Sequence, residues 1–193
     1  MKENQLNYFF DMDGVLAKYI MQDYLGDNPL YMKKNYHYFK KLEPDSKMIN
    51  VLKSINSYCN KEQKGKVFII TSVTNIGDMF LEHTMDKISW LNQYAPFIDT
   101  KTQFIAAISA KQEIAKSICR PSQNLSYNDI LIDDFNHNLN NWQNAGGQAV
   151  KYLNGINSPN TENSEITFSG LNLTENMSSR DIITTLKLLS QSY

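Results

Sequence analysis

Residues 6–16 read Leu6-Asn7-Tyr8-Phe9-Phe10-Asp11-Met12-Asp13-Gly14-Val15-Leu16. An apolar run of this kind is typical of a buried strand, and it ends in two carboxylates followed by a glycine that lets the chain turn. In an open α/β sheet, ligands bind beyond the carboxyl ends of the strands, so Asp11 and Asp13 are expected at the mouth of a site. Because neighbouring carboxylates repel each other and are costly to desolvate, the stretch predicts a divalent cation between them.

A plain polar turn or a calcium-binding loop could also place two carboxylates before a glycine. A calcium loop is excluded because Val15 and Leu16 follow the glycine, so the usual third oxygen ligand is missing. In addition, Gln22 stands where the closing glutamate of such a loop is needed. The plain turn stays open when the stretch is considered alone.

The whole chain has the length and composition of one α/β domain. Its 193 residues are 41% hydrophobic and 20% charged, which suits a single substantial core. A net charge of -1 offers no electrostatic footprint for a nucleic-acid polymer or an anionic membrane, so we expect neither partner. The polar segment Met1–Gln5 is unlike a signal peptide, and no apolar stretch has transmembrane length, so the expected location is cytoplasmic. A homodimer stays open.

Strands and helices are expected to alternate along the chain. Further strands are predicted at residues 66–72, 100–106, 129–134 and 148–152, and helices are predicted to begin near residues 45, 78, 110, 136 and 178. This alternation predicts a Rossmann-like α/β fold, with a central parallel sheet and helices on both faces. In the second helix, the apolar residues at helical spacing are Leu81, Met85, Ile88 and Leu91.

Residues 17–44 are rich in aromatic side chains but show no sustained period. The segment is too long for a simple loop in a compact domain, so we expect short helical pieces that form a small cap over the site. The cap is then an insertion within a single domain spanning residues 1–193. The tail after Ser158 is not placed, apart from its last helix.

Parallel pairing would bring the ends of three strands to one edge of the sheet. The polar residues at those ends are Asp11, Asp13, Thr71, Ser72, Asp133 and Asp134. Oxygen ligands of this kind suit magnesium, which also keeps waters and substrate phosphate in its shell. One carboxylate can attack phosphorus, and another can protonate the leaving oxygen and then activate water. The convergence therefore predicts a magnesium-dependent site for phosphate chemistry.

The order of these motifs resembles that of the haloacid dehalogenase-type phosphohydrolases: Asp-x-Asp-Gly, then Thr-Ser, then a lysine, then Ile-Asp-Asp. Within that superfamily, the chain is similar to the 5'(3')-deoxyribonucleotidase family. The segments that carry this closer similarity are Tyr38-Phe39-Lys40-Lys41-Leu42-Glu43-Pro44, Asp86-Lys87-Ile88-Ser89-Trp90, and Trp142 with Gly146-Gly147. The resemblance covers residues 6 to about 157 and implies a haloacid dehalogenase-like domain with a cap at residues 17–44.

The resemblance also implies roles for the acidic residues. Asp11 is expected to be the nucleophile and a metal ligand. Asp13 is expected to be the general acid and base, and to offer its carbonyl oxygen to the metal. Asp134 is expected to be the third protein ligand of the metal, while Asp133 orients a lysine or a water molecule.

The phosphate contacts implied by the resemblance are Thr71, Ser72, Lys87 and Lys111. Lys111, at the start of a helix, fits the position of the phosphate-binding lysine. Lys101 or Lys116 could take its place, because the segment between Lys111 and Asp133 is long for the family. Lys87 matches a second lysine that contacts phosphate.

The implied activity is hydrolysis of (deoxy)nucleoside monophosphates to nucleoside and phosphate through an aspartyl phosphate, with Mg²⁺ as cofactor. A small nucleotide is the expected partner. Tyr19 and Phe39 are the candidates to flank the base, since stacking contributes roughly 1 to 3 kcal/mol per base. The alternatives are a phosphatase for another small phosphate monoester and a catalytically weak nucleotide-binding module.

The remaining aromatic and sulfur-containing residues are expected to be structural. Trp90 and Trp142 are predicted to lie in the core. Cys59 and Cys119 are too few for a disulfide framework or a zinc site and are expected to be reduced. The histidines are predicted to lie on the surface, because no metal-ligand spacing relates His37, His83 and His137.

Overall fold

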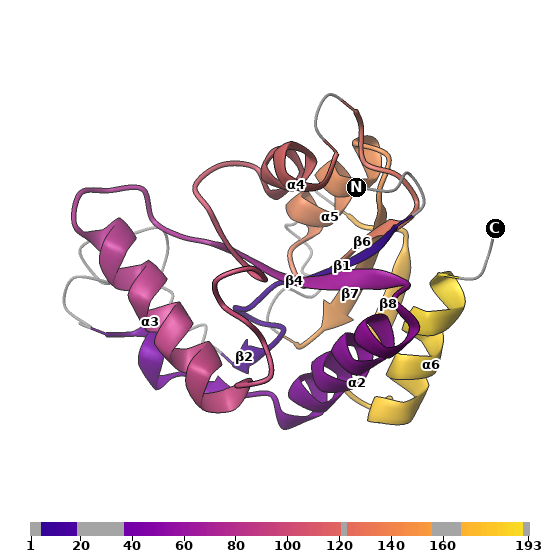
Figure 1. Cartoon of the computed structure of the whole chain (residues 1–193), viewed down its shortest axis with the longest axis horizontal. Coiled ribbons are helices and arrows are strands. Elements are labelled where there is room, and N and C mark those ends of the chain that lie inside the picture. Colours follow the sequence, from indigo (N-terminus) through magenta and orange to yellow (C-terminus); the bar gives the residue numbers. More distant parts are fainter. Residues whose placement is uncertain (1–4, 19–36, 121–122, 156–166, 191–193) are drawn as a thin grey trace.

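The computed structural model describes residues 5–18, 37–120, 123–155 and 167–190. In this part of the chain, six strands form one parallel sheet in the order β5-β4-β1-β6-β7-β8 (Figure 1). These strands are β1 (Leu6–Phe10), β4 (Gly65–Ser72), β5 (Phe104–Ala107), β6 (Asp129–Asp133), β7 (Gln148–Leu153) and β8 (Leu171–Thr174). The predicted parallel sheet is confirmed, with β1 between β4 and β6.

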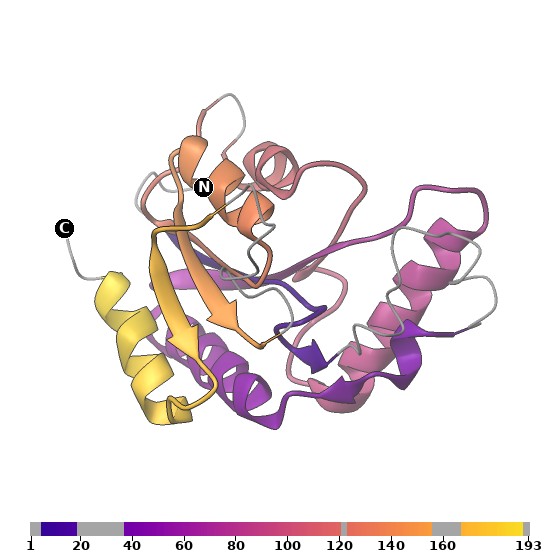
Figure 2. The ribbon, with the colours of Figure 1, turned by 180° about the vertical axis from the view of Figure 1, so that it is seen from behind.

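Helices cover both faces of this sheet, as the two opposite views show (Figures 1 and 2). The helices on one face are α2 (Ser46–Glu62) and α6 (Ser179–Leu189), and those on the other are α4 (Lys111–Cys119) and α5 (Asn136–Asn144). α3 (Met79–Tyr94) lies to one side, next to the short 3-10 helix η1 (Phe39–Lys41). Within the described ranges, no helix combines the length and apolar character needed to cross a membrane.

The central strand β1 supplies side chains to two hydrophobic cores. Tyr8 and Phe10 pack into the core beneath α2 and α6, whereas Phe9 points into the core beneath α4 and α5. The Phe9 ring stacks on Phe68, with centroids 5.1 Å apart, and meets the edge of the buried Trp142 at 4.9 Å. Because side chains alternate between the faces of a strand, a strand covered on both sides is apolar at most positions, which explains the run; the buried Asn7 is the exception and donates to Asp129 at 2.7 Å.

α2 forms as its sequence predicts. The Asp45 side chain caps the helix by accepting a hydrogen bond from the backbone N–H of Met48 at 3.0 Å, which satisfies one of the unpaired donors at the helix start. The apolar residues of its inner face, all fully buried, are Met48, Val51, Leu52 and Ile55. This face anchors α2 to the sheet.

α3 is present as expected, but its buried side is only partly the expected one. Leu91 is buried as predicted, whereas Leu81 and Met85 are 64% and 56% exposed. The other buried residues of the helix are Met79, His83, Asp86, Lys87 and Trp90. This side packs against the η1 segment, where the buried Trp90 donates its Nε1–H to the Leu42 carbonyl at 2.7 Å. Polar contacts therefore help to set the orientation of α3. The prediction that His83 lies on the surface is wrong, because this residue is buried.

The expected cap, residues 17–44, is described only at its two ends. β2 (Ala17–Lys18) pairs antiparallel with β3 (Glu43–Pro44), and η1 comes just before β3. Residues 19–36, which include the predicted base contact Tyr19, lie outside the described residues. The helical cap therefore stays a prediction.

The tail contributes a strand that sequence analysis does not place. β8 pairs with β7 and extends the sheet to a sixth strand. Its sequence, Leu-Asn-Leu-Thr, alternates apolar and polar residues, but only over four positions, the shortest length at which alternation indicates a strand. This weak pattern explains why β8 escapes prediction.

The predicted final helix, α6, completes one core. Its cap is confirmed, because Ser178 Oγ accepts the backbone N–H of Asp181 at 3.2 Å. Ile182 and Leu186 are fully buried, and the Tyr8 hydroxyl donates to the Leu186 carbonyl at 2.9 Å. The helix is therefore joined to the central strand through both apolar packing and a buried hydrogen bond.

We predict that Leu186→Ala lowers the free energy of unfolding by about 2 to 5 kcal/mol, because it leaves a cavity between α6 and the sheet. Leu188, on the same helix, is 57% exposed. Leu188→Ala should therefore change stability by no more than about 0.5 kcal/mol. Urea unfolding of both variants measures the difference, and equal values would contradict the docking of α6.

Candidate functional site

The carboxyl ends of three adjacent strands, β4, β1 and β6, gather polar side chains at one edge of the sheet. Asp11 directly follows β1, and Thr71 and Ser72 end β4. Asp133 ends β6, and Asp134 comes next. The parallel pairing that the alternation predicts, with β1 between β4 and β6, therefore brings these residues together from distant parts of the chain.

Three of the carboxylates form a buried cluster. Asp11, Asp133 and Asp134 are 6%, 0% and 2% exposed, and one oxygen of each lies within 4.8 Å of the others. The Lys111 ammonium bridges Asp11 Oδ1 at 2.8 Å and Asp133 Oδ2 at 2.7 Å. Burial raises the pKa of Asp11 well above its usual range, with Lys111 opposing this shift and the neighbouring carboxylates adding to it. Burial alone would lower the pKa of Lys111, but Asp11 and Asp133 raise it overall.

Of the three lysines considered for this position, the structure brings Lys111 to the acidic cluster. Its place at the start of α4 directs the ammonium toward the end of β6. Lys101 is exposed, and Lys116 pairs with Glu113 on the surface at 3.0 Å. Neither of them is a partner of Asp11 or Asp133 in the described residues.

A second buried cation, Lys87, lies beside the first. Its ammonium donates to Thr71 Oγ1 at 2.7 Å, to the Ser72 carbonyl at 2.9 Å, and to the Asp13 carboxylate. The Asp13 side chain is 24% exposed, and its Oδ1 accepts no hydrogen bond from the described part of the chain. Asp13 is thus held through one oxygen, and its other oxygen is buried without a hydrogen-bond partner among the described residues.

Asn154 belongs to the site, although sequence analysis does not single it out. Its Nδ2 donates to Asp134 Oδ2 and to the Gly14 carbonyl, both at 2.8 Å. Gly14 has a φ of +82°, and a Cβ there would collide with Asp134 Oδ2, so this turn requires glycine. Asn154 directly follows β7, the neighbour of β6, so the rule that found the aspartates could also have found it.

Asp133 is held in place by its neighbours as well as by Lys111. Its Oδ1 accepts the backbone N–H of Phe135 at 2.8 Å, and its Oδ2 accepts Nδ2 of Asn138 at 3.1 Å. Lys151, also missed from sequence, is buried nearby and donates to Asn136 Oδ1. Burial lowers the pKa of Lys151, although the nearby aspartates act in the opposite direction.

Comparison with known proteins shows that solved structures share the fold of this chain. No protein-family model and no curated protein matches the chain. The chain is similar to D,D-heptose 1,7-bisphosphate phosphatase from Burkholderia thailandensis, with a TM-score of 0.59 at 10% identity, over 95% of this chain and 99% of that one. It is also similar to a hydrolase from Pseudomonas syringae (TM-score 0.56, 12% identity, 95% and 99% covered) and to a haloacid dehalogenase-like family hydrolase from Streptococcus pneumoniae (0.55, 10%, 95% and 99%). The chain has the haloacid dehalogenase-type fold.

In this haloacid dehalogenase-type fold, the acidic cluster fits a divalent cation. Asp11, Asp133 and Asp134 bring three carboxylates into a region that is almost without solvent, and Lys111 is shared between two of them. A buried group of like charges is destabilising unless more positive charge is supplied. Since the acidic donors are all oxygens, the set is suited to a hard cation such as Mg²⁺.

Phe39, expected to flank a base, lies next to Lys87. The Lys87 ammonium sits 4.3 Å from the centre of the Phe39 ring, a cation–π distance, and the ring meets His83 edge-on at 4.8 Å. Phe39 is only 5% exposed, so little of its surface is open to a ligand. Its contact with a base stays a prediction, whereas its contact with Lys87 is a feature of the structure.

We predict that Lys111→Met destabilises the protein by roughly 3 to 5 kcal/mol in the absence of divalent cations, because Asp11 and Asp133 lose their buried counter-charge. Lys116→Met provides a matched control, since it breaks only a surface pair worth at most about 1 kcal/mol. Chemical unfolding in chelator compares the two. A cost for Lys111→Met no larger than that of the control would contradict the bridging role of Lys111.

Proposed function

We propose that this protein is a Mg²⁺-dependent phosphomonoesterase in which Asp11 is the nucleophile. One observation carries the proposal: the Asp11 carboxylate lies beside a buried lysine and two further buried carboxylates, while Asp13, two residues on, has an oxygen without a hydrogen-bond partner among the described residues. A nucleophile, a cation, metal-type ligands and an acid or base are the groups that transfer of a phosphoryl group to a carboxylate needs. The haloacid dehalogenase-type fold supports the same conclusion.

The proposed reaction has two steps. In the first, an oxygen of Asp11 attacks phosphorus, the bond from phosphorus to the ester oxygen breaks, and protonated Asp13 gives its proton to the departing alcohol. In the second, Asp13 removes a proton from water, the water oxygen attacks phosphorus, and phosphate leaves as the Asp11 carboxylate is restored. Both halves use the same acid and base in opposite directions, which balances the protons.

The residues around Asp11 have complementary tasks in this proposal. Asp11, the Asp13 carbonyl and Asp134 would hold the metal, which when bound supplies positive charge to the phosphoryl oxygens. Lys111 would stabilise the same oxygens from its own side. Thr71 accepts a hydrogen bond from Lys87, so its own hydroxyl proton can be donated to phosphate.

We further propose that the preferred substrate is a (deoxy)nucleoside monophosphate. The support is the resemblance of two segments, 38–44 and 86–90, to the 5'(3')-deoxyribonucleotidase family. These segments touch each other in the structure: Trp90 donates to the Leu42 carbonyl, and Lys87 lies over the Phe39 ring. They therefore form one unit at the site. A sugar phosphate is the alternative favoured by the heptose bisphosphate phosphatase of similar fold.

The proposed chemistry predicts the behaviour of two aspartate variants. Asp11→Asn should abolish phosphate release while leaving the fold intact, because an amide keeps the shape but is no nucleophile. Asp13→Asn should slow turnover by about 10²- to 10⁴-fold and let a phosphoenzyme accumulate, because the water step loses its base. Phosphate release and acid-quenched labelling measure both effects. Near-normal rates in either variant would refute the assigned roles.

Excess chelator should likewise abolish turnover, and added Mg²⁺ should restore it.

The substrate proposal is tested by comparing kcat/KM for thymidine, deoxyuridine and uridine monophosphates with that for glycerol phosphate and glucose 6-phosphate. Nucleotides should be favoured at least several-fold. Equal values would leave a general phosphatase, whereas nucleotide binding without phosphate release would indicate a binding module.

Replacing Phe39 distinguishes two roles of its ring, packing over Lys87 and stacking on the base of a nucleotide substrate. Because the ring covers Lys87, Phe39→Ala should lower kcat/KM roughly two- to thirtyfold on nucleotides and sugar phosphates alike, in line with the loss of a cation–π contact. Phe80→Ala, at a partly exposed position on α3, is the matched control and should change little. A loss confined to nucleotides would instead show that Phe39 stacks on the base.

A further inference from the structure

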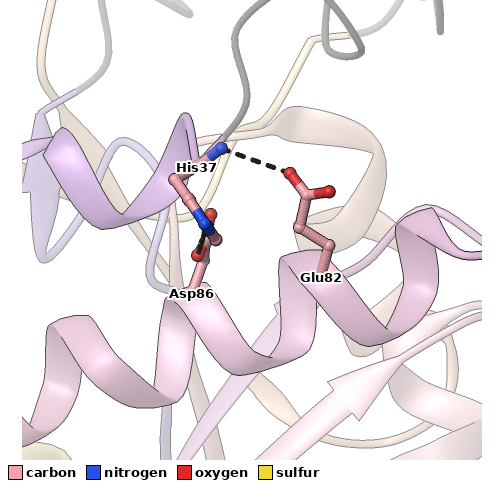
Figure 3. Close-up of side chains that lie close together, drawn as sticks. All are labelled: His37, Glu82 and Asp86. Carbon is pink, nitrogen blue, oxygen red and sulfur yellow. Dashed lines mark hydrogen bonds and ion pairs between the residues drawn. The ribbon is translucent and has the colours of Figure 1, made fainter.

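A second group of metal-type ligands lies between α3 and the segment that leads into η1. It consists of His37, Glu82 and Asp86, with one ligand atom of each within 4.8 Å of the others (Figure 3). His37 Nδ1 lies 2.6 Å from Asp86 Oδ1, and the His37 backbone N–H donates to Glu82 Oε1 at 3.2 Å. The two acids stand one helical turn apart and 45 and 49 residues away from the histidine along the chain. This distance explains why no spacing motif reveals the group.

Asp86 is the residue that indicates a missing partner. It is 2% exposed, and its carboxylate points from α3 toward the His37 ring (Figure 3). His37 accounts for Oδ1, but Oδ2 is buried without a hydrogen-bond partner among the described residues. An unsatisfied buried oxygen of a carboxylate is costly, so a native structure normally supplies it with a donor or a cation.

The ligand types of His37, Glu82 and Asp86 indicate which cation would bind. We propose that His37, Glu82 and Asp86 form a binding site for a zinc-class divalent ion, separate from the acidic cluster at the sheet edge. One imidazole and two carboxylates are a ligand set for zinc with an open position for water. The acidic cluster around Asp11 holds only oxygens and suits magnesium better. The two sites therefore differ in the metal that they prefer.

The site is accessible to an ion from solution. The His37 side chain is 43% exposed, whereas Asp86 supplies the buried base of the site. Zinc binds an unprotonated imidazole nitrogen, so its binding would replace the His37–Asp86 hydrogen bond and release any proton that this pair shares. Two carboxylates would then neutralise the two charges of the ion.

An ion at this site would join two parts of the chain that meet around Lys87. Lys87 directly follows Asp86 on α3, and Phe39, two residues after His37, covers the Lys87 ammonium. The ion would fix the segment leading into η1 against α3. Its expected effect is therefore greater stability of this contact, independent of any turnover at Asp11.

Zinc titration of the chelator-treated full chain tests the proposal, with saturating Mg²⁺ present to occupy the acidic cluster. Competition with a chromophoric chelator measures the bound zinc. The wild type should bind one equivalent, and His37→Ala and Glu82→Gln should each lose it. His137→Ala, at an exposed histidine, and Asp134→Asn, in the acidic cluster, should each keep it.

Thermal unfolding supplies a second readout that does not depend on activity. Zinc at about 100 times its Kd should raise the Tm of the wild type by about 5 to 10 °C and leave that of Glu82→Gln unchanged. Two results would overturn the proposal: no zinc bound by the wild type, or undiminished binding in both His37→Ala and Glu82→Gln. Loss of the zinc in Asp134→Asn alone would place the ion in the acidic cluster instead.

Discussion

The structure depends on how it neutralises like charges buried at one edge of its sheet. Lys111 lies between Asp11 and Asp133 where almost no solvent reaches, and neither carboxylate could remain ionised there alone. The surrounding elements position these side chains. Asp11 follows β1, Asp133 ends β6 and Lys111 begins α4. The Phe135 N–H donates to Asp133 and fixes its orientation. Stability and the proposed chemistry therefore depend on the same contacts.

Short-range patterns are sufficient to predict the elements that position the site. The apolar run before Asp11, the cap at Asp45 and the acidic end of β6 each act within a few residues, so periodicity and capping rules identify them. The alternation of strands and helices predicts parallel pairing, and the structure supplies the order, with β1 between β4 and β6. That order places the predicted aspartates and Thr71 together without knowledge of any side-chain contact.

The remaining features depend on partners far away along the chain. The inner side of α3 includes a buried lysine because Lys87 bonds to Thr71 and Asp13, and no local pattern contains that information. Asn154 gains its role from Gly14, 140 residues earlier. The choice of Lys111 over its neighbours likewise depends on which ammonium reaches Asp133.

The position of β1 in the sheet has a consequence for the order in which the protein folds. Its partner β6 is more than a hundred residues away, as the bond between Asn7 and Asp129, 122 positions apart, illustrates. Closing so long a loop is slow, and it must precede the meeting of Asp11 with Asp133. An unfolded chain therefore holds these carboxylates apart and has little affinity for a divalent cation. Such ions should act on the folded state, slowing its opening more than they speed its formation.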